Sequence, residues 1–275
     1  MAKDLVGKVA IITGGAGGIG KALAQELAVR GCYLVLADIN AELLQTTAAE
    51  LRGTGAQLDA KTVDVRDAAH VRALIEGAFE DLGRIDYLFN NAGVNVCAEL
   101  CDTSLEDWNL LIDVNLRGVV HGVHAAYPIM REQGFGHIIN TASAAGLIPA
   151  AAEGAYAATK HAVVGLSSAL RIEARASRVK VSVVCPGVID TPIIGSTKYV
   201  KFDPEAILKA IPEKPMDPRK AARLILRGVD RNQFYIVVTA TAHVLWRFHR
   251  YAPNASIQLG RIAIGKFRRT RREDG

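Results

Sequence analysis

Three side chains suited to proton transfer fall within one short run of the sequence. Ser143, Tyr156 and Lys160 all lie in SAAGLIPAAAEGAYAATK, residues 143–160. Tyr156 and Lys160 are four residues apart, and on a helix that spacing places both side chains on one face, about one turn from each other. A phenol beside an ammonium group loses its proton more easily than a free phenol. The pair therefore suggests an acid or base acting on an oxygen atom, although the same spacing is also common on ordinary exposed helices.

A glycine-rich segment upstream has the sequence pattern of a phosphate-binding turn. Residues 8–12, KVAII, are apolar and β-branched, which predicts a buried strand. TGGAGGIG follows at residues 13–20, and the next residues, KALAQELAVRG, have helical periodicity. In a strand–turn–helix context, glycines let the backbone approach a pyrophosphate, and the helix N-terminus supplies free N–H donors. The segment therefore predicts a dinucleotide site.

Asp38 indicates which dinucleotide is bound. The second predicted strand, CYLVLAD, ends at Asp38, eighteen residues after Gly20. A carboxylate in this place hydrogen-bonds the adenosine ribose hydroxyls of NAD and repels the 2′-phosphate of NADP. Ile39 and Asn40 are uncharged, and the glycine turn contains no Lys or Arg. We predict NAD as the cofactor. The alternative role for Asp38 is a helix N-cap, which Asn40 can also provide.

These motifs occur in the order typical of a known enzyme family. With Asp64–Val65, NNAG at 90–93 and PGVIDT at 186–191, they make the chain resemble the short-chain dehydrogenase/reductase family over residues 5 to about 240. The resemblance implies the catalytic residues Asn115, Ser143, Tyr156 and Lys160. It implies cofactor contacts by Gly14, Gly18, Ile19, Gly20, Asp38, Ile39, Asp64, Val65, Asn91, Ala92, Gly93, Tyr156, Lys160, Pro186, Gly187, Val188, Ile189 and Thr191.

The resemblance also implies an activity, which is hydride transfer between NAD and a secondary alcohol or ketone. Tyr156 would move the hydroxyl proton, with its pKa lowered by Lys160 and by the positive nicotinamide ring. Lys160 would also hold the nicotinamide ribose, Asn115 would order a water, and Ser143 would bind the substrate oxygen. Taken singly, Ser143 is equally typical of a turn, and Asn115 of a polar helix face. The alternative function is a non-catalytic NAD-binding interaction or sensor protein.

The elements that must position these residues alternate between strand and helix. This alternation predicts an α/β fold, a doubly wound parallel sheet of Rossmann type, in a single domain. Pro128 is expected to kink or end the helix around it. The polar candidates follow predicted strands, whose carboxyl ends share one edge of the sheet. We predict strands near 8–13, 33–38, 60–65, 85–90, 137–142, 179–185 and 234–239, and helices near 18–30, 41–53, 68–82, 104–131, 155–176, 204–210 and 217–230.

Residues 188–215 form a long connection that we interpret as a substrate lid. Loops of this length are uncommon unless they are functional, the alternative being a disordered surface excursion. Its apolar residues favour a hydrophobic alcohol, a steroid-like ring or an acyl chain, and a small diol or hydroxyketone stays open. The lid's apolar residues are Ile193, Ile194, Tyr199, Val200 and Ile211, and the predicted substrate pocket consists of Val94, Val96, Leu147, Ile193 and Ile194.

The composition fits one compact domain, because half of the 275 residues are hydrophobic and no linker or repeat divides the chain. Cys32 and Cys185 lie in or beside strands and are expected to be buried, and Cys97 and Cys101 lack a second ligand pair, so no metal is expected. The sequence shows no signal peptide and no apolar run long enough to span a membrane, which predicts a reducing cytoplasm.

The positive charge is concentrated at the C-terminus. Residues 243–275 contain eight Lys or Arg and two acidic residues, whereas residues 1–242, the predicted catalytic domain, are nearly neutral. This basic, partly apolar extension could cover the substrate loop, form a subunit contact or lie on an anionic membrane surface. No nucleic-acid motif accompanies it, so nucleic acid is not an expected partner. Two helices rich in small residues, 104–131 and 155–176, predict a homodimer or homotetramer, as in the family.

Overall fold

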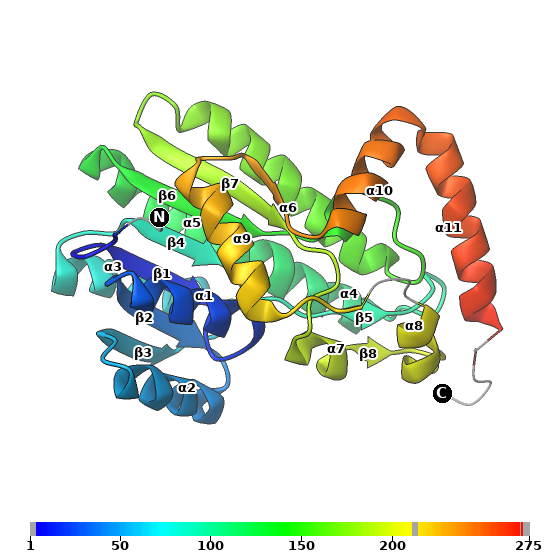
Figure 1. The fold of residues 1–275 in the computed structure, drawn as a ribbon, viewed down its shortest axis with the longest axis horizontal. Coiled ribbons are helices and arrows are strands. Elements are labelled where there is room, and N and C mark those ends of the chain that lie inside the picture. Colours follow the sequence, from blue (N-terminus) through cyan, green and yellow to red (C-terminus); the bar gives the residue numbers. More distant parts are fainter. Residues whose placement is uncertain (1–3, 211–213, 270, 272–275) are drawn as a thin grey trace.

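A single seven-stranded sheet, with every neighbouring pair parallel, organises the molecule (Figure 1). A computed structural model describes residues 4–210, 214–269 and 271. The strand order is β3-β2-β1-β4-β6-β7-β9, so the chain reverses direction across the sheet between β1 and β4. This confirms the doubly wound fold. The strands are β1 (Val9–Thr13), β2 (Tyr33–Asp38), β3 (Leu58–Thr62), β4 (Tyr87–Asn90), β6 (Gly136–Thr141), β7 (Val179–Cys185) and β9 (Tyr235–Val237).

Helices cover both faces of the sheet, which explains why its central strands are almost wholly apolar. All five residues of β1 are buried. One hydrophobic core joins the sheet to α1 (Gly18–Val29), α2 (Ala41–Gly53) and α9 (Pro218–Asp230). A second core joins the opposite face to α3 (Ala68–Leu82), α5 (Gly118–Gln133) and α6 (Gly154–Glu173).

The predicted helix at 104–131 has an interruption that the sequence did not indicate. It consists of α4 (Leu105–Ile112), a π-helical turn η1 (Asp113–Arg117) and then α5. Pro128, which is expected to kink or end the helix around it, does not end it, because α5 continues to Gln133. Pro128 is exposed, so water can bond the carbonyl that its ring leaves without an N–H partner.

The predicted lid contains regular secondary structure and is not a long irregular loop. It contains α7 (Pro192–Ser196), β8 (Lys198–Tyr199) and α8 (Pro204–Ala210). Strand β8 pairs in parallel with β5 (Val96–Cys97) in a separate two-stranded sheet. Ile211 and Pro212 of the predicted lid lie outside the described residues. The pairing of β5 with β8 anchors the lid beside the segment that follows β4.

The C-terminal extension folds as two helices, α10 (Ala240–Tyr251) and α11 (Pro253–Arg268). The proposed domain boundary at residue 242 falls inside α10. In Figure 1 the two helices form a hairpin at one end of the sheet, with α11 beside α8. Ile264 and Phe267 of α11 pack against Phe202 and Ile207 of the lid. Among the described residues, no helix is long and apolar enough to cross a membrane.

Candidate active site

The glycine turn between β1 and α1 leaves no room for side chains at its two tightest positions. Gly14 has a φ of +66°, and a Cβ there would lie 2.9 Å from Cα of Ala92. A Cβ on Gly20 would collide with the carbonyl oxygen of Gly14. Helix α1 starts at Gly18 with no side-chain cap and no acid in its first turn. Its first N–H groups are therefore free to meet a phosphate.

Hydrogen bonds from the end of β4 hold this turn in place. Thr13 Oγ1 accepts the backbone N–H groups of Asn91 at 3.0 Å and Ala92 at 3.2 Å. The Asn91 amide donates to the carbonyls of Thr13 at 3.2 Å and Gly14 at 3.3 Å. The NNAG segment therefore positions the glycine turn, a structural role that the sequence motif alone did not reveal.

Asp38 stands half-buried at the end of β2, where the sequence placed it. Its two carboxylate oxygens accept backbone N–H groups from Ala16 at 3.1 Å and Asn40 at 3.0 Å. Asn40 caps α2 by accepting the N–H of Leu43 at 3.0 Å. The N-cap alternative for Asp38 therefore does not hold, and the fixed carboxylate can still accept further hydrogen bonds.

We call the groove above this turn the glycine cleft, a hollow of about 460 Å³ that runs from Asp38 to Tyr156. Its lining also contains Gly17 of the glycine motif and three residues that the motifs missed, Leu43, Pro192 and Ser196. The predicted cofactor residues that line it are Gly14, Gly18, Ile19, Asp38, Ile39, Asn91, Ala92, Gly93, Tyr156, Lys160, Pro186, Gly187, Ile189 and Thr191.

Four predicted cofactor residues do not line the glycine cleft. Gly20 is buried beneath the turn. Asp64 forms an ion pair with Arg66, at 2.6 Å between carboxylate and guanidinium, which holds the pKa of Asp64 below its usual value. Val65 lies directly against Gly118. Val188 faces the neighbouring cavity instead.

Lys160 and Tyr156 lie together on α6 as their spacing predicts. The Lys160 ammonium is 5.5 Å from the centre of the Tyr156 ring and donates to the carbonyl of Thr141 at 3.1 Å. Both residues are buried. Burial lowers the pKa of Lys160 to about 8. Lys160 forms no ion pair with any carboxylate of the described residues.

The acidity expected of Tyr156 is not found in the protein alone. Burial raises the pKa of Tyr156 above its ordinary value, and the Glu153 carboxylate adds to the rise. A hydrogen bond with Ser143 acts in the opposite direction and does not offset burial. Lys160 is not among the groups that lower the pKa of Tyr156 in the protein alone. The expected lowering by Lys160 together with the nicotinamide ring stays a prediction.

Asn115 is fully buried in the π-helical turn η1. Its side-chain oxygen accepts the N–H of Val94, and its amide donates to the carbonyl of Val94, both at 2.9 Å. A single-turn π-helix is a common feature of functional sites, because it redirects one side chain. Here the redirected amide fixes the backbone next to Gly93. The relay water expected from the family stays a prediction.

A second hollow, about 320 Å³, adjoins the glycine cleft on the far side of Tyr156, and we call it the lid cavity. Ile193 and Ile194 line it as predicted, whereas Val94, Val96 and Leu147 do not and pack into the surrounding core. Side chains alternate along extended chain, so Asn95 and Cys97 face the cavity in place of their valine neighbours. Further lining residues that the sequence did not indicate are Glu153, Tyr199, Ile207, Thr241 and Leu245.

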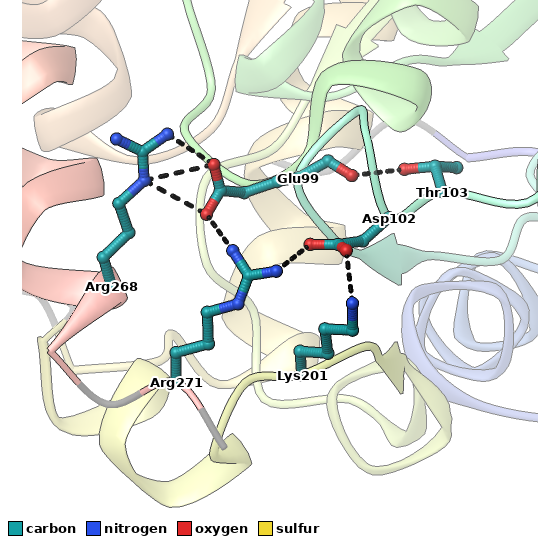
Figure 2. Close-up of polar contacts among 6 residues, drawn as sticks. All are labelled: Glu99, Asp102, Thr103, Lys201, Arg268 and Arg271. Atoms are coloured by element: carbon teal, nitrogen blue, oxygen red, sulfur yellow. Dashed lines mark hydrogen bonds and ion pairs between the residues drawn. The ribbon is translucent and has the colours of Figure 1, made fainter. Parts of the chain in front are cut away.

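The C-terminal extension contributes a wall of this cavity through Thr241, Ala242 and Leu245 of α10. Figure 2 shows the ion pairs that fasten its other end. Arg268 contacts Glu99 at 3.1 Å, and Arg271 contacts Asp102 at 2.7 Å. Lys201 of the lid also pairs with Asp102, at 2.7 Å. The carboxylates are only 11% and 9% exposed, and their cationic partners hold both pKa values below the usual range.

The arrangement can hold a dinucleotide and exchange one proton with a bound oxygen atom. The glycine cleft offers backbone N–H groups, a carboxylate at one end, and Tyr156, Ser143 and Lys160 at the other. All four cysteines are free, and Cys32 and Cys185 are buried as expected. The described residues contain no cluster of His, Cys, Asp or Glu that could hold a metal ion.

Comparisons with known proteins agree with this geometry. The family model for short chain dehydrogenases matches residues 8–199. The oxidoreductase UcpA of Escherichia coli is 40% identical over 249 residues, covering 88% of this chain and 94% of that protein. The 1-deoxy-11-beta-hydroxypentalenate dehydrogenase of Streptomyces exfoliatus is 40% identical over 243 residues, covering 87% of this chain and 86% of that one.

A solved structure extends the likeness to three dimensions. A short-chain dehydrogenase/reductase from Burkholderia phymatum, crystallised in complex with NAD, superposes with a TM-score of 0.85 at 33% identity. The match covers 92% of this chain and 96% of that one. The chain therefore belongs to the short-chain dehydrogenase/reductase family of oxidoreductases.

Proposed function

We propose that the protein is an NAD-dependent dehydrogenase that interconverts a secondary alcohol and its ketone. One observation carries this proposal: Tyr156 and Ser143 line both the glycine cleft and the lid cavity. A proton donor at the boundary between a dinucleotide groove and an apolar cavity is placed where an alcohol oxygen would meet it. Bound NAD would supply the hydride acceptor, and NADH the hydride donor.

The residues of the glycine cleft fit NAD. Gly14, Gly17 and Gly18 line the glycine cleft, and together with the free N–H groups of α1 they suit a pyrophosphate. Asp38 suits the two ribose hydroxyls and repels a 2′-phosphate, which supports NAD over NADP. Lys160, with no carboxylate partner among the described residues, has donors free for the second ribose. Thr191, whose hydroxyl donates to the carbonyl of Ile189 at 3.3 Å, would contact the nicotinamide carboxamide.

Burial of the Tyr156 hydroxyl affects its proton transfer differently in the two directions of the reaction. Because burial keeps Tyr156 protonated, it is suited to donate to the alkoxide that forms when a ketone is reduced. In the oxidation direction Tyr156 would accept the alcohol proton, which requires positive charge beside it, from Lys160 and from the oxidised nicotinamide. Ser143 would hold the substrate oxygen and stabilise its developing charge.

The lid cavity supports an uncharged organic substrate. Ile193 and Ile194 give it an apolar wall, and no Lys or Arg of the described chain lines it.

We also propose that the protein assembles as a homodimer or homotetramer through α5 and α6, supported by the exposed apolar side chains of Val120 and Ile172. A cytoplasmic location and contact of the extension with a membrane surface stay predictions.

Substitution of Tyr156 by Phe tests the proposal. With a panel of secondary alcohols and NAD, NADH formation by Tyr156→Phe should fall by at least about 100-fold, because only the proton-transferring hydroxyl is removed. The dissociation constant for NAD, measured by calorimetry, should change by less than about threefold. Tyr251→Phe, at an 84% exposed tyrosine, is the matched control and should behave as wild type. Turnover that survives in Tyr156→Phe would contradict the catalytic assignment.

A further inference from the structure

Glu153 is a carboxyl group inside the lid cavity that the reaction described above does not use. It is the N-cap residue of α6, yet its side chain caps no N–H group of that helix. Instead it accepts a hydrogen bond from the Asn95 amide at 2.8 Å, and both residues line the lid cavity. The side chain is therefore turned away from its local helix and toward the space beside Tyr156.

The pair has unused hydrogen-bonding capacity. Only one Glu153 carboxylate oxygen has a hydrogen-bond partner among the described residues, and no cation pairs with it there. The side-chain oxygen of Asn95 is buried and has no hydrogen-bond partner in the described part of the chain. Buried polar atoms are almost always bonded, so an unpartnered amide oxygen next to a free carboxyl oxygen marks a place for a ligand atom.

The position of Glu153 relative to Tyr156 sets where that ligand atom would lie. Glu153 directly precedes α6, three residues before Tyr156, and both residues line the lid cavity. The charge of Glu153 acts on the pKa of Tyr156, which places the two groups near each other. A substrate whose reacting oxygen meets Tyr156 can present a second oxygen to Glu153 from the adjacent carbon or the next one. Desolvation raises the pKa of Glu153, which favours the neutral carboxyl and an uncharged partner.

We propose that Glu153 and Asn95 form a polar subsite for a second, uncharged oxygen of the substrate, which makes 1,2- or 1,3-diols and the matching hydroxyketones the preferred substrate class. The inference rests on the proposed dehydrogenase function and specifies its substrate. The neutral carboxyl can donate its proton to a carbonyl or hydroxyl oxygen while its other oxygen keeps the bond from Asn95. A hydrocarbon at the same place would leave the second Glu153 oxygen and the Asn95 oxygen without a partner, which disfavours simple alcohols.

The test compares ring alcohols that differ only in the second group. Rates with NAD are measured for cyclohexanol, cyclohexane-1,2-diol, cyclohexane-1,3-diol and 2-aminocyclohexanol. In wild type, kcat/KM for the better diol should exceed that for cyclohexanol by about tenfold or more, the size of one hydrogen bond. In Glu153→Ala this ratio should fall to within about twofold of unity, and Glu153→Gln should keep most of it.

Two further measurements separate the possible failures. Glu76→Ala, at an exposed glutamate of α3, is the control and should leave both rates and their ratio as in wild type. Binding of the same alcohols to the Tyr156→Phe variant with NAD, followed by calorimetry, reports on the subsite without turnover. If wild type and Glu153→Ala prefer the diol over cyclohexanol to the same extent, or if wild type prefers 2-aminocyclohexanol over the diols, the proposed subsite is overturned. Absence of any turnover, with diol-selective binding intact, would instead contradict the proposed reaction.

Discussion

The two hollows that meet at Tyr156 are built in different ways. The glycine cleft is formed mainly by residues that end or follow β1, β2, β4, β6 and β7, whose positions the sheet fixes, and by residues of α6. The first part of the lid, from Thr191 to Ser196, lies along one side of it. The lid cavity is formed by the β5 segment, the lid and α10, which are joined by a two-stranded sheet and by ion pairs. Most of the cofactor site therefore depends on the sheet and its helices, whereas most of the substrate site depends on segments that can change without disturbing them.

The largest effect is expected from displacing the glycine turn from beneath. Gly20→Ala would drive a methyl group into the carbonyl of Gly14 and toward the Asn91 amide, which displaces the turn. We expect NAD affinity to fall by at least about 100-fold, comparable to the loss of two or more hydrogen bonds to phosphate. Calorimetric titration of NAD provides the measurement.

Gly77→Ala is the matched control for this change. A Cβ on Gly77 in α3 would have no atom within 4 Å. Alanine inside a helix is favoured over glycine by roughly 0.5–1 kcal/mol, so this control should unfold at a slightly higher temperature and bind NAD normally. If Gly20→Ala binds NAD as wild type does, the glycine turn is not the phosphate site.

A smaller effect is expected at the other end of the cleft. Asp38→Asn removes the negative charge but keeps a side-chain oxygen for the N–H of Ala16 or Asn40. NAD affinity should fall by about tenfold, and the ratio of kcat/KM for NADP to that for NAD should rise, because repulsion of the 2′-phosphate is lost. Asp81→Asn, at an exposed residue of α3, should change neither value. An unaltered cofactor ratio in Asp38→Asn would show that this carboxylate does not select the cofactor.

The smallest effect should appear on the substrate side alone. The double variant Arg268→Gln with Arg271→Gln breaks the contacts of the extension with Glu99 and Asp102 (Figure 2). Loosening α11 against the lid should raise KM for the alcohol by about fivefold, equivalent to roughly 1 kcal/mol for an ion-pair network. NAD affinity should stay within about twofold of wild type, because no contact of the glycine cleft is altered.

Arg269→Gln serves as the control for the ion-pair variant. Arg269 is exposed and makes no ion pair with any residue that the structure describes. Its replacement removes one positive charge, against two in the double variant, from the same end of α11 and should leave KM unchanged. A double variant with normal KM would mean that the ion pairs do not hold the cavity wall in place.

The difference between the glycine cleft and the lid cavity also explains which residues the sequence could predict. The glycine turn, Asp38 and the Tyr156–Lys160 pair are local patterns, so strand ends and helix spacing were enough to locate them. Contacts between residues far apart in the sequence could not be predicted from such local patterns. Arg268 and Glu99 are separated by 169 positions, and nothing in either neighbourhood indicates the other.

Two errors have local causes. The valines at 94 and 96 were chosen as pocket residues because they are apolar, but apolar side chains of an extended segment turn toward the core and leave Asn95 and Cys97 facing the cavity. The high charge of the extension does not by itself predict the helices α10 and α11. The stripe of Gly260, Ile264 and Phe267 has helical spacing and could have indicated α11.

A crystal structure of the protein with NAD is the most direct test of the central claim. The account predicts the pyrophosphate over the turn of Gly14 to Gly20, the adenosine ribose at Asp38, and the nicotinamide ring between Tyr156 and Thr191, open to the lid cavity. A nicotinamide found outside the glycine cleft, or one separated from the Tyr156 hydroxyl by intervening protein, would contradict it.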